Sequence, residues 1–267
     1  FTTTANAVSP VGDYSIIPQV GTLASANYEF SFVNGKLKVD KAVLTVTADS
    51  ASRLYGQSNP AFTATYSGYK NGEDLSTSGV TGAPILTTNA NPLSGAGTYN
   101  ITIESGSLDA FNYRFNLVNS NLNVGKAVVT VKANNANRVY GQADPAFTAS
   151  YQGFVNGESY ASSGIVGVPG YTTDATQFSG VGTYTITPST GTLSAANYTF
   201  DYSTGSLSIT KAVVSVTAED YIRYYGDPNP VLTAAYEGFA NGESFATSGI
   251  SGTPAMSTTT DAFSGVG

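Results

Sequence analysis

The sequence predicts a mostly β protein that is built as a tandem array of small modules of 85 residues. The first observation is a stretch that begins KAVLTVTA at residue 41 and returns as KAVVTVKA at 126 and KAVVSVTA at 211. The second is an alternation of apolar and polar residues within each copy, which is the period of a half-buried strand. The third is the recurrence of glycine and proline between these runs, which predicts turns.

The repeat also predicts the module boundaries. Residues 41–125 and 126–210 align without a gap and match at 42 of 85 positions. Residues 1–40 repeat the later part of a copy, and residues 211–267 repeat the earlier part. Self-similarity at a fixed period indicates an array, and a segment of this size can bury a small core of its own. We therefore expect two complete modules between two partial ones.

Five alternating runs in the first complete copy predict its strands, since branched and aromatic side chains pack well on a pleated surface. In chain order they are Leu44–Ala48, Phe62–Tyr66, Tyr99–Ile103, Tyr113–Leu117 and Leu122–Val124. The stretch NGEDLSTSG predicts at most one short helix per module, with Asn71 as its cap. The expected module is β-grasp-like or a small sandwich.

The boundary between modules contains no linker. The stretch NLNVGKAVVTV runs from the last strand of one copy into the first strand of the next. A connection without a Gly/Ser-rich or Pro-rich segment cannot behave as a flexible coil. Neighbouring modules should therefore keep a restricted orientation, and the array should form an extended rod.

The composition excludes several classes of function. The chain has no Cys and no His, so it offers no thiol nucleophile, thiolate ligand or disulfide. Its net charge of −7 argues against nucleic acid or an anionic membrane as partner. No apolar run approaches the roughly 18 residues of a membrane-spanning segment. A cysteine-free chain rich in Thr, Ser, Gly, Asn and Tyr resembles exported bacterial surface proteins.

No motif indicates catalysis, a cofactor or a metal. Serine hydrolases need a base, and a Ser–Lys signature is also missing. The recurrent acids follow Asn-Gly, which suggests turn chemistry, and they are Glu73, Glu158 and Glu243. Calcium needs several oxygen ligands in one loop, but acidic positions shift between copies, as where Asp49 becomes Asn134. We expect a protein that is not an enzyme and has no cofactor.

Two sets of recurrent residues are candidate sites. The tyrosine before a loop glycine is the aromatic residue least typical of a core, and it predicts a ligand contact at Tyr55, Tyr140 and Tyr225. Lys, Asn and Glu are the residue types of spontaneous isopeptide crosslinks, and the alternative is a solvated or paired junction lysine. The crosslink candidates are Lys41, Lys126, Lys211, Asn112, Asn197, Glu73 and Glu158.

Three stretches together carry a resemblance to a known family: RLYGQSNPAFTATYSGYKNGED, SGAGTYNITI and NYRFNLVNSNLNVGKAVVTV. They resemble the bacterial MBG repeat family of the YGX type, over the whole chain. The resemblance implies small β-rich modules in secreted or wall-attached adhesins and haemagglutinin-like proteins. It implies no catalytic residue.

Two functions remain open at this point. The first is a structural spacer, a stalk or filament at a bacterial surface, whose partners are neighbouring modules or further copies of the chain. The second is a multivalent binder with a weak glycan or protein site in each module, where avidity supplies the affinity. A spacer repeats its core and junction residues, whereas a binder must also repeat an exposed cluster. The recurrent set favours the spacer.

The partial modules carry a further expectation. Each leaves an apolar face and unpaired strand edges, which invite pairing with another chain. We expect the chain to be a window on a longer array, and the edges near Tyr28, Phe30 and Leu37, and those near Val214, Val216 and Leu232, to meet partner strands from chain beyond this window or from a neighbouring copy.

Overall fold

The computed structural model describes residues 1–265 and contains strands and turns but no helix in that range. The complete segment 41–125 contains seven strands: β4 (Ala42–Ala48), β5 (Ala51–Leu54), β6 (Ala64–Ser67), β7 (Ile85–Thr87), β8 (Gly97–Glu104), β9 (Tyr113–Val118) and β10 (Ser120–Gly125). They form a three-stranded sheet of order β6-β4-β9 and a four-stranded sheet of order β5-β10-β8-β7. The prediction of a mostly β fold with tandem repeats is confirmed.

Segment 126–210 repeats this plan. Its strands are β11 (Ala127–Ala133), β12 (Ala136–Val139), β13 (Ala149–Gln152), β14 (Gly170–Thr173), β15 (Gly182–Ser189), β16 (Tyr198–Ser203) and β17 (Gly205–Thr210). The sheet orders are β13-β11-β16 and β12-β17-β15-β14, the same as before. The end segments carry β1 (Thr2–Thr3), β2 (Gly12–Ile17) and β3 (Gly35–Val39), and β18 (Ser215–Ala218) and β19 (Ala234–Glu237). Each sheet draws its strands from one segment.

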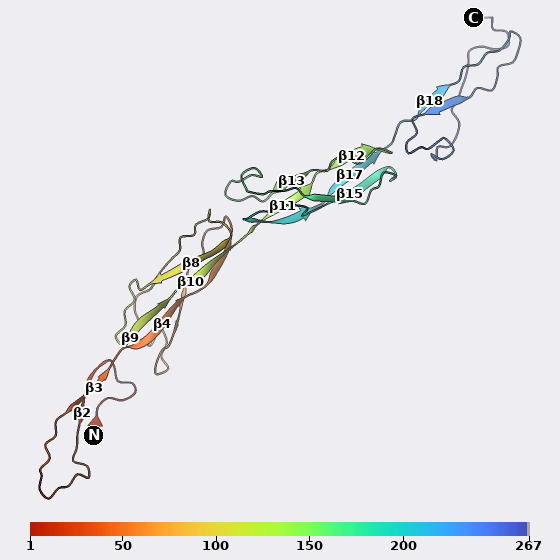
Figure 1. Cartoon of the computed structure of the whole chain (residues 1–267). Helices are drawn as coiled ribbons and strands as arrows, with labels where there is room; N and C mark the ends of the chain where they lie inside the picture. The colour runs from red at the N-terminus through yellow and green to blue at the C-terminus, as the bar shows by residue number, and fades with distance from the viewer. Residues whose placement is uncertain (266–267) are drawn as a thin grey trace. The chain divides into compact units, whose positions relative to one another are not determined.

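Two long parallel strands connect both sheets of a complete module. β4 pairs with β9, with Ala42 opposite Tyr113, and β5 pairs with β10, with Ala51 opposite Leu122. Both pairings have the same sequence offset, so β4–β5 and β9–β10 keep one register across the break. Figure 1 shows β9 beside β4 and β10 beside β8. The chain therefore enters at one end of the module and leaves at the other, about 40 Å away at the usual rise per strand residue.

The core follows the predicted alternation. Leu44, Val46 and Ala48 of β4 are buried, whereas Thr45 and Thr47 between them are only half-buried. In the second complete segment Ile186, Leu207 and Ile209 lie in one buried cluster. Because side chains of a strand point alternately to opposite faces, one register suffices to bury this whole set.

The sequence allowed at most one short helix per module, and residues 1–265 contain none. The stretch NGEDLSTSG forms a hydrogen-bonded turn, in which Ser78 donates to the carbonyl of Asp74 at 2.9 Å. The Asp74 carboxylate accepts from the amides of Ser76 and Thr77, so Asp74 holds the position expected for Asn71. Asn71 instead has a φ of 55°, a left-handed value that Asn tolerates better than most residues. The short strands β5 and β7 were also missed, since three or four residues show too little periodicity.

The chain divides into two compact units. The first comprises residues 1–127 together with Val155–Glu158 and Ala196–Tyr198, and the second comprises the remainder. Both short additions belong in sequence to the segment 126–210. One carries its Asn-Gly-Glu turn and the other its Asn-Tyr pair. Residues of one module are thus part of the compact unit built on the module before it.

Candidate functional site at the module junction

The junction begins at the exit end of β5, where Tyr55 and Gly56 follow the strand. The Tyr55 amide donates to the carbonyl of Gly125 at 2.8 Å, which places the tyrosine beside the point where the chain leaves the module. Only 4% of its surface is exposed. The position that looked least core-like in the sequence is therefore buried, because another module's turn covers it.

A carboxylate of the following module receives this tyrosine. The Tyr55 hydroxyl donates to Oε1 of Glu158 at 2.6 Å, and the Tyr198 hydroxyl donates to Oε2 of the same residue at 2.5 Å. The two rings meet edge to face, with centroids 5.7 Å apart. Hydrogen bonds to an ionised group are about twice as strong as those between neutral groups. Glu158 thus connects a tyrosine of its own module with one of the preceding module.

The glycine beside Tyr55 is required by close packing. Gly56 has a φ of 85°, which L side chains rarely adopt, and a Cβ there would lie 2.6 Å from Cβ of Val155. Gly56 donates its amide to the carbonyl of Pro92 at 3.2 Å, and Asn156 donates its side-chain amide to that carbonyl at 3.2 Å. The Tyr-Gly loop and the Asn-Gly-Glu turn are therefore complementary surfaces.

An asparagine makes the second attachment. Oδ1 of Asn197 accepts from the amide of Ala96 at 3.0 Å, and a Cβ on Gly95 would lie 2.8 Å from that oxygen. The loop is shaped from within its own module, since the Tyr99 hydroxyl donates to the carbonyl of Gly95 at 2.9 Å. The same bond recurs one period earlier, where Oδ1 of Asn112 accepts from the amide of Val11 at 3.0 Å.

The tyrosine–glutamate contact also recurs one period later, within the second unit. The Tyr140 hydroxyl donates to Oε1 of Glu243 at 2.6 Å, as Tyr55 does to Glu158. A Cβ on Gly141 would lie 2.4 Å from Cβ of Ala240, which stands where Val155 stands in the preceding junction. Two junctions therefore use one design, with residues separated by the same number of positions.

The environment of the junction raises the pKa of its tyrosines. The hydrogen bond to Glu158 is the largest cause that raises the pKa of Tyr55. Burial, followed by the bond to Glu158, raises the pKa of Tyr198 to about 12. Burial and the bond to Glu73 likewise raise the pKa of Tyr113. The phenols are neutral at pH 7 even with an ordinary pKa, and the raised pKa keeps them hydrogen-bond donors to a higher pH.

Comparison with protein families bears on the tyrosine–glycine motif directly. The model of the MBG domain of the YGX type matches residues 44–123, 129–208 and 214–267. The chain belongs to the MBG domain family. No curated protein matches the chain. The partners that the structure supports for each MBG module are its neighbours in the same chain.

A recurrent arginine supports the Tyr-Gly loop of each complete MBG module, and sequence reasoning missed it. Arg53 is 6% exposed, and its Nε donates to Oδ1 of Asn59 while Nη2 donates to the carbonyl of Asn91 at 2.5 Å. Arg138 pairs with Asp144 at 2.7 Å and donates to the carbonyl of Thr176. The available signal was its recurrence two residues before the tyrosine.

The predicted ligand contacts of the MBG modules lie in two different environments. Tyr55 and Tyr140 donate to glutamates of the next module, so their hydroxyls face protein. Tyr225 is 67% exposed. Sequence reasoning also treated Glu73, Glu158 and Glu243 as turn residues, whereas Glu158 and Glu243 each accept a tyrosine across a junction. Ligand binding at these tyrosines stays a prediction.

The predicted crosslink residues lie near the junctions, and their side chains contact different partners. Nζ of Lys41 donates to the carbonyl of Ala110 at 2.8 Å, and Glu73 accepts from Tyr113 at 2.5 Å. Asn112 and Asn197 accept from backbone amides of the preceding module. The isopeptide bond stays a prediction, and intact mass would show one ammonia lost per complete module. Lys126 lies at the start of its segment and Lys211 is exposed.

Residues 1–265 hold no group of three or more His, Cys, Asp or Glu side chains that could bind a metal ion. They also form no helix with the length and hydropathy of a membrane span.

Proposed function

We propose that the chain is a structural repeat segment of a bacterial extracellular adhesin or surface fibre, in which the modules form a rigid stalk. The observation that carries this proposal is the use of the recurrent polar and aromatic residues. Tyr55, Glu158 and Asn197 connect one module with the next, and their equivalents do so again. A binder would expose such residues to its ligand, whereas here they form contacts between modules.

The junction contacts would restrain bending in more than one direction. The covalent connection at Gly125 is one point, the Tyr55–Glu158 bond is a second, and the Ala96–Asn197 bond is a third. Three separated points define an orientation, whereas a single linker does not. The absence of a flexible linker between the last strand and the next module supports the same proposal.

Composition supports the location and the lack of catalysis in this proposal. A cysteine-free and histidine-free acidic chain, rich in small polar residues, suits an exported surface protein. The proposal includes no enzymatic activity, no cofactor, no nucleic-acid partner and no insertion into a membrane. A host or cell-surface glycan or protein would be bound elsewhere in the fibre.

A distance measurement across one junction tests the stalk. The chain has no cysteine, so spin labels can be placed at Asn116→Cys and Asp201→Cys, which are equivalent exposed positions in the two complete modules. We expect a narrow distribution of label distances, and a broader one when Glu158→Gln is added. A distribution as broad as that of a flexible linker in the unaltered junction would overturn the proposal.

One observation favours the alternative of a multivalent binder. A single position carries a large, exposed apolar side chain in all four copies, at Val8, Leu93, Phe178 and Phe263, each at least 65% exposed. Weak contacts at such a position would gain from avidity. A glycan or protein array probed with the chain and with a Leu93→Ser/Phe178→Ser variant separates the two functions. If the unaltered chain binds and the variant does not, the result supports the multivalent binder. If the unaltered chain does not bind, the result supports the stalk.

A further inference from the structure

We propose that each complete module bears tension along the chain, and that its first and last strands form a mechanical clamp. In module 41–125 the clamp consists of β4 and β5 on one side and of β9 and β10 on the other. Tension enters the module just before β4 and leaves it just after β10. This inference goes beyond the stalk proposed above, since bending is resisted at the junctions whereas stretching is resisted inside each module.

The direction of the paired strands carries the inference. β4 and β9 are parallel and share six paired positions, and β5 and β10 are parallel and share four. Tension pulls the start of β4 and the end of β10 in opposite directions along the strands. The strands must therefore slide past each other before they separate, and this sliding loads all of their hydrogen bonds together. Parallel strands that are pulled apart from the same end lose these bonds one at a time.

A backbone hydrogen bond closes the clamp at each end. The Ala42 amide donates to the carbonyl of Asn112 at 2.9 Å, and the Tyr55 amide donates to the carbonyl of Gly125 at 2.8 Å. The paired strands therefore cover the whole path from the entry of the chain into the module to its exit. The second complete module repeats both bonds one period later, at 2.9 Å and 2.8 Å, as Ala127–Asn197 and Tyr140–Thr210.

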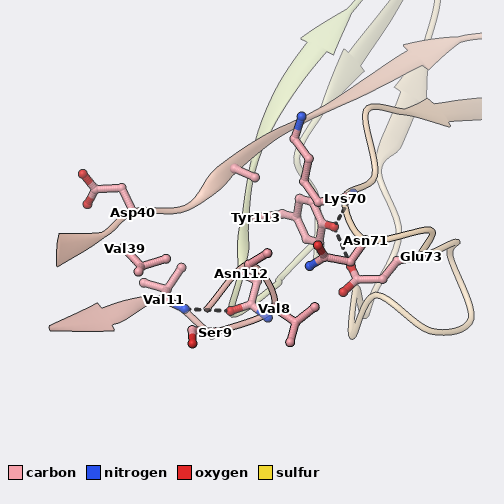
Figure 2. A pocket seen from close by; sticks show the side chains of 12 residues that line it. Val8, Ser9, Val11, Val39, Asp40, Lys70, Asn71, Glu73, Asn112 and Tyr113 are labelled. Carbon is pink, nitrogen blue, oxygen red and sulfur yellow. Dashed lines mark hydrogen bonds between the residues drawn. The ribbon is translucent and has the colours of Figure 1, made fainter. Parts of the chain in front are cut away.

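Buried polar side chains fix both ends of the clamp. At the entry, the hydroxyl of the buried Tyr113 accepts from the Lys70 amide and donates to Glu73, and Figure 2 shows it between these two residues. At the exit, Nη1 of the buried Arg53 donates to the carbonyl of Leu54 at 3.1 Å. A buried polar group that loses its partner carries the full cost of its desolvation. These side chains therefore oppose sliding at the points where tension enters and leaves.

The edge strands of the module lie outside this path. β6 and β7 are at the edges of their sheets, where β6 pairs antiparallel with β4 and β7 pairs antiparallel with β8. Neither edge strand is next in sequence to the entry or the exit of the module. A bond added across the clamp should therefore raise the resistance to force, whereas an equally strong bond added between β7 and β8 should not.

Paired histidines test this contrast in the full chain, which has no histidine of its own. Val43 of β4 and Arg114 of β9 are exposed and lie opposite each other, so Val43→His/Arg114→His creates a Ni²⁺ site across the clamp. Ile85 of β7 and Glu104 of β8 are also exposed and opposite each other, so Ile85→His/Glu104→His is the matched site outside the clamp. Urea unfolding with and without Ni²⁺ measures how much each site stabilises the folded state.

An optical trap that holds both ends of the chain measures the response to tension. A complete module releases up to about 300 Å of chain when it unfolds, and the unaltered module 126–210 is the reference in the same molecule. At a Ni²⁺ concentration ten times the dissociation constant, unfolding of the Val43→His/Arg114→His module at constant force should slow about tenfold. Unfolding of the Ile85→His/Glu104→His module should keep its rate. Equal slowing at both sites, or none at the clamp site, would overturn the proposal.

The direction of pulling provides an independent test that needs no metal. Handles on Asp40→Cys and Asn123→Cys pull the clamp from opposite ends, whereas handles on Asp40→Cys and Phe111→Cys pull two strand starts at the same end. The three side chains are exposed and the chain has no cysteine, so the attachment is specific. At one loading rate, the first pair should require a several-fold higher force than the second.

The outcomes of this test are separate from those of the stalk. Similar unfolding forces in the two directions would refute the clamp, whatever the stiffness of the junction. A broad distribution of spin-label distances across the junction would reject the rigid stalk. That result would leave the clamp unaffected, because both pairs of handles lie within or next to one module.

Discussion

Replacing Tyr55 by Phe should loosen one junction and leave the rest of the array unchanged. The substitution keeps the ring that packs against Tyr198 and removes the hydroxyl that donates to Glu158 at 2.6 Å. The carboxylate keeps its second donor, Tyr198, and so is not left unpaired. The change is therefore confined to one hydrogen bond between modules.

The size of the effect follows from the burial of this bond. Hydrogen bonds to charged groups contribute about 1.5–3 kcal/mol, and Tyr55 is 4% exposed, so water cannot readily replace the lost donor. Because Glu158 retains one tyrosine, we expect about 1.5 kcal/mol, at the lower end of that range. Such a loss corresponds to roughly a tenfold rise in the population of the open junction.

Hydrogen exchange at high dilution measures this opening. The amide of Gly56 donates to Pro92 beside the altered tyrosine, and the amide of Ala96 donates to Asn197 at the second attachment. Exchange of both amides by local opening should accelerate about tenfold if the junction opens as a unit. Tyr225→Phe is the matched control, since within residues 1–265 the Tyr225 hydroxyl makes no hydrogen bond.

The pattern of protection distinguishes the alternatives. Acceleration at Gly56 alone would show that the two attachments open independently. Unchanged exchange at both amides would refute the argument that the tyrosine–glutamate bond restrains the junction. A cycle with Glu158→Gln completes the measurement, because the coupling between the two changes isolates their interaction.

Two further predictions concern the same junction. Gly56→Ala should destabilise the junction by about 1–3 kcal/mol more than Gly226→Ala destabilises its own segment. Both glycines have similar positive φ values, but only at Gly56 would an added Cβ lie 2.6 Å from Val155. Urea unfolding monitored by hydrogen exchange measures both losses of stability, and equal losses would show that backbone strain alone is responsible. Raising the pH should open the junction, because its phenols have a raised pKa, which for Tyr198 is about 12. The contribution of these phenols to stability is complete below the unfolded pKa of about 10 and is lost as the pH rises through the folded pKa. Tyrosinate absorbance of the folded chain should therefore rise at a higher pH than that of the urea-unfolded chain. Titration of both chains at the same pH would contradict this prediction.

Much of the fold could be predicted from the sequence because its signals are local. Alternation in LTVTA determines which residues of β4 are buried, and only one register satisfies it. The repeat length and the missing linker depend on the order of residues alone. The three matches to the MBG domain family rest on the same recurrent positions. These features need no knowledge of which segments meet in space.

The pairing of surfaces was decided by the tertiary structure. Tyr55 and Glu158 lie 103 positions apart, and nothing local indicates that a loop tyrosine of one module contacts the turn of the next. The parallel pairing of β5 with β10 brings the exit at Gly125 beside Leu54, and this places Tyr55 at the boundary between modules. The sequence around a recurrent Glu in a turn is the same whether its carboxylate is solvated or hydrogen-bonded, because the donor is supplied by another module. The sequence by itself therefore determined the module and its period, and the folded chain decided how the modules are joined.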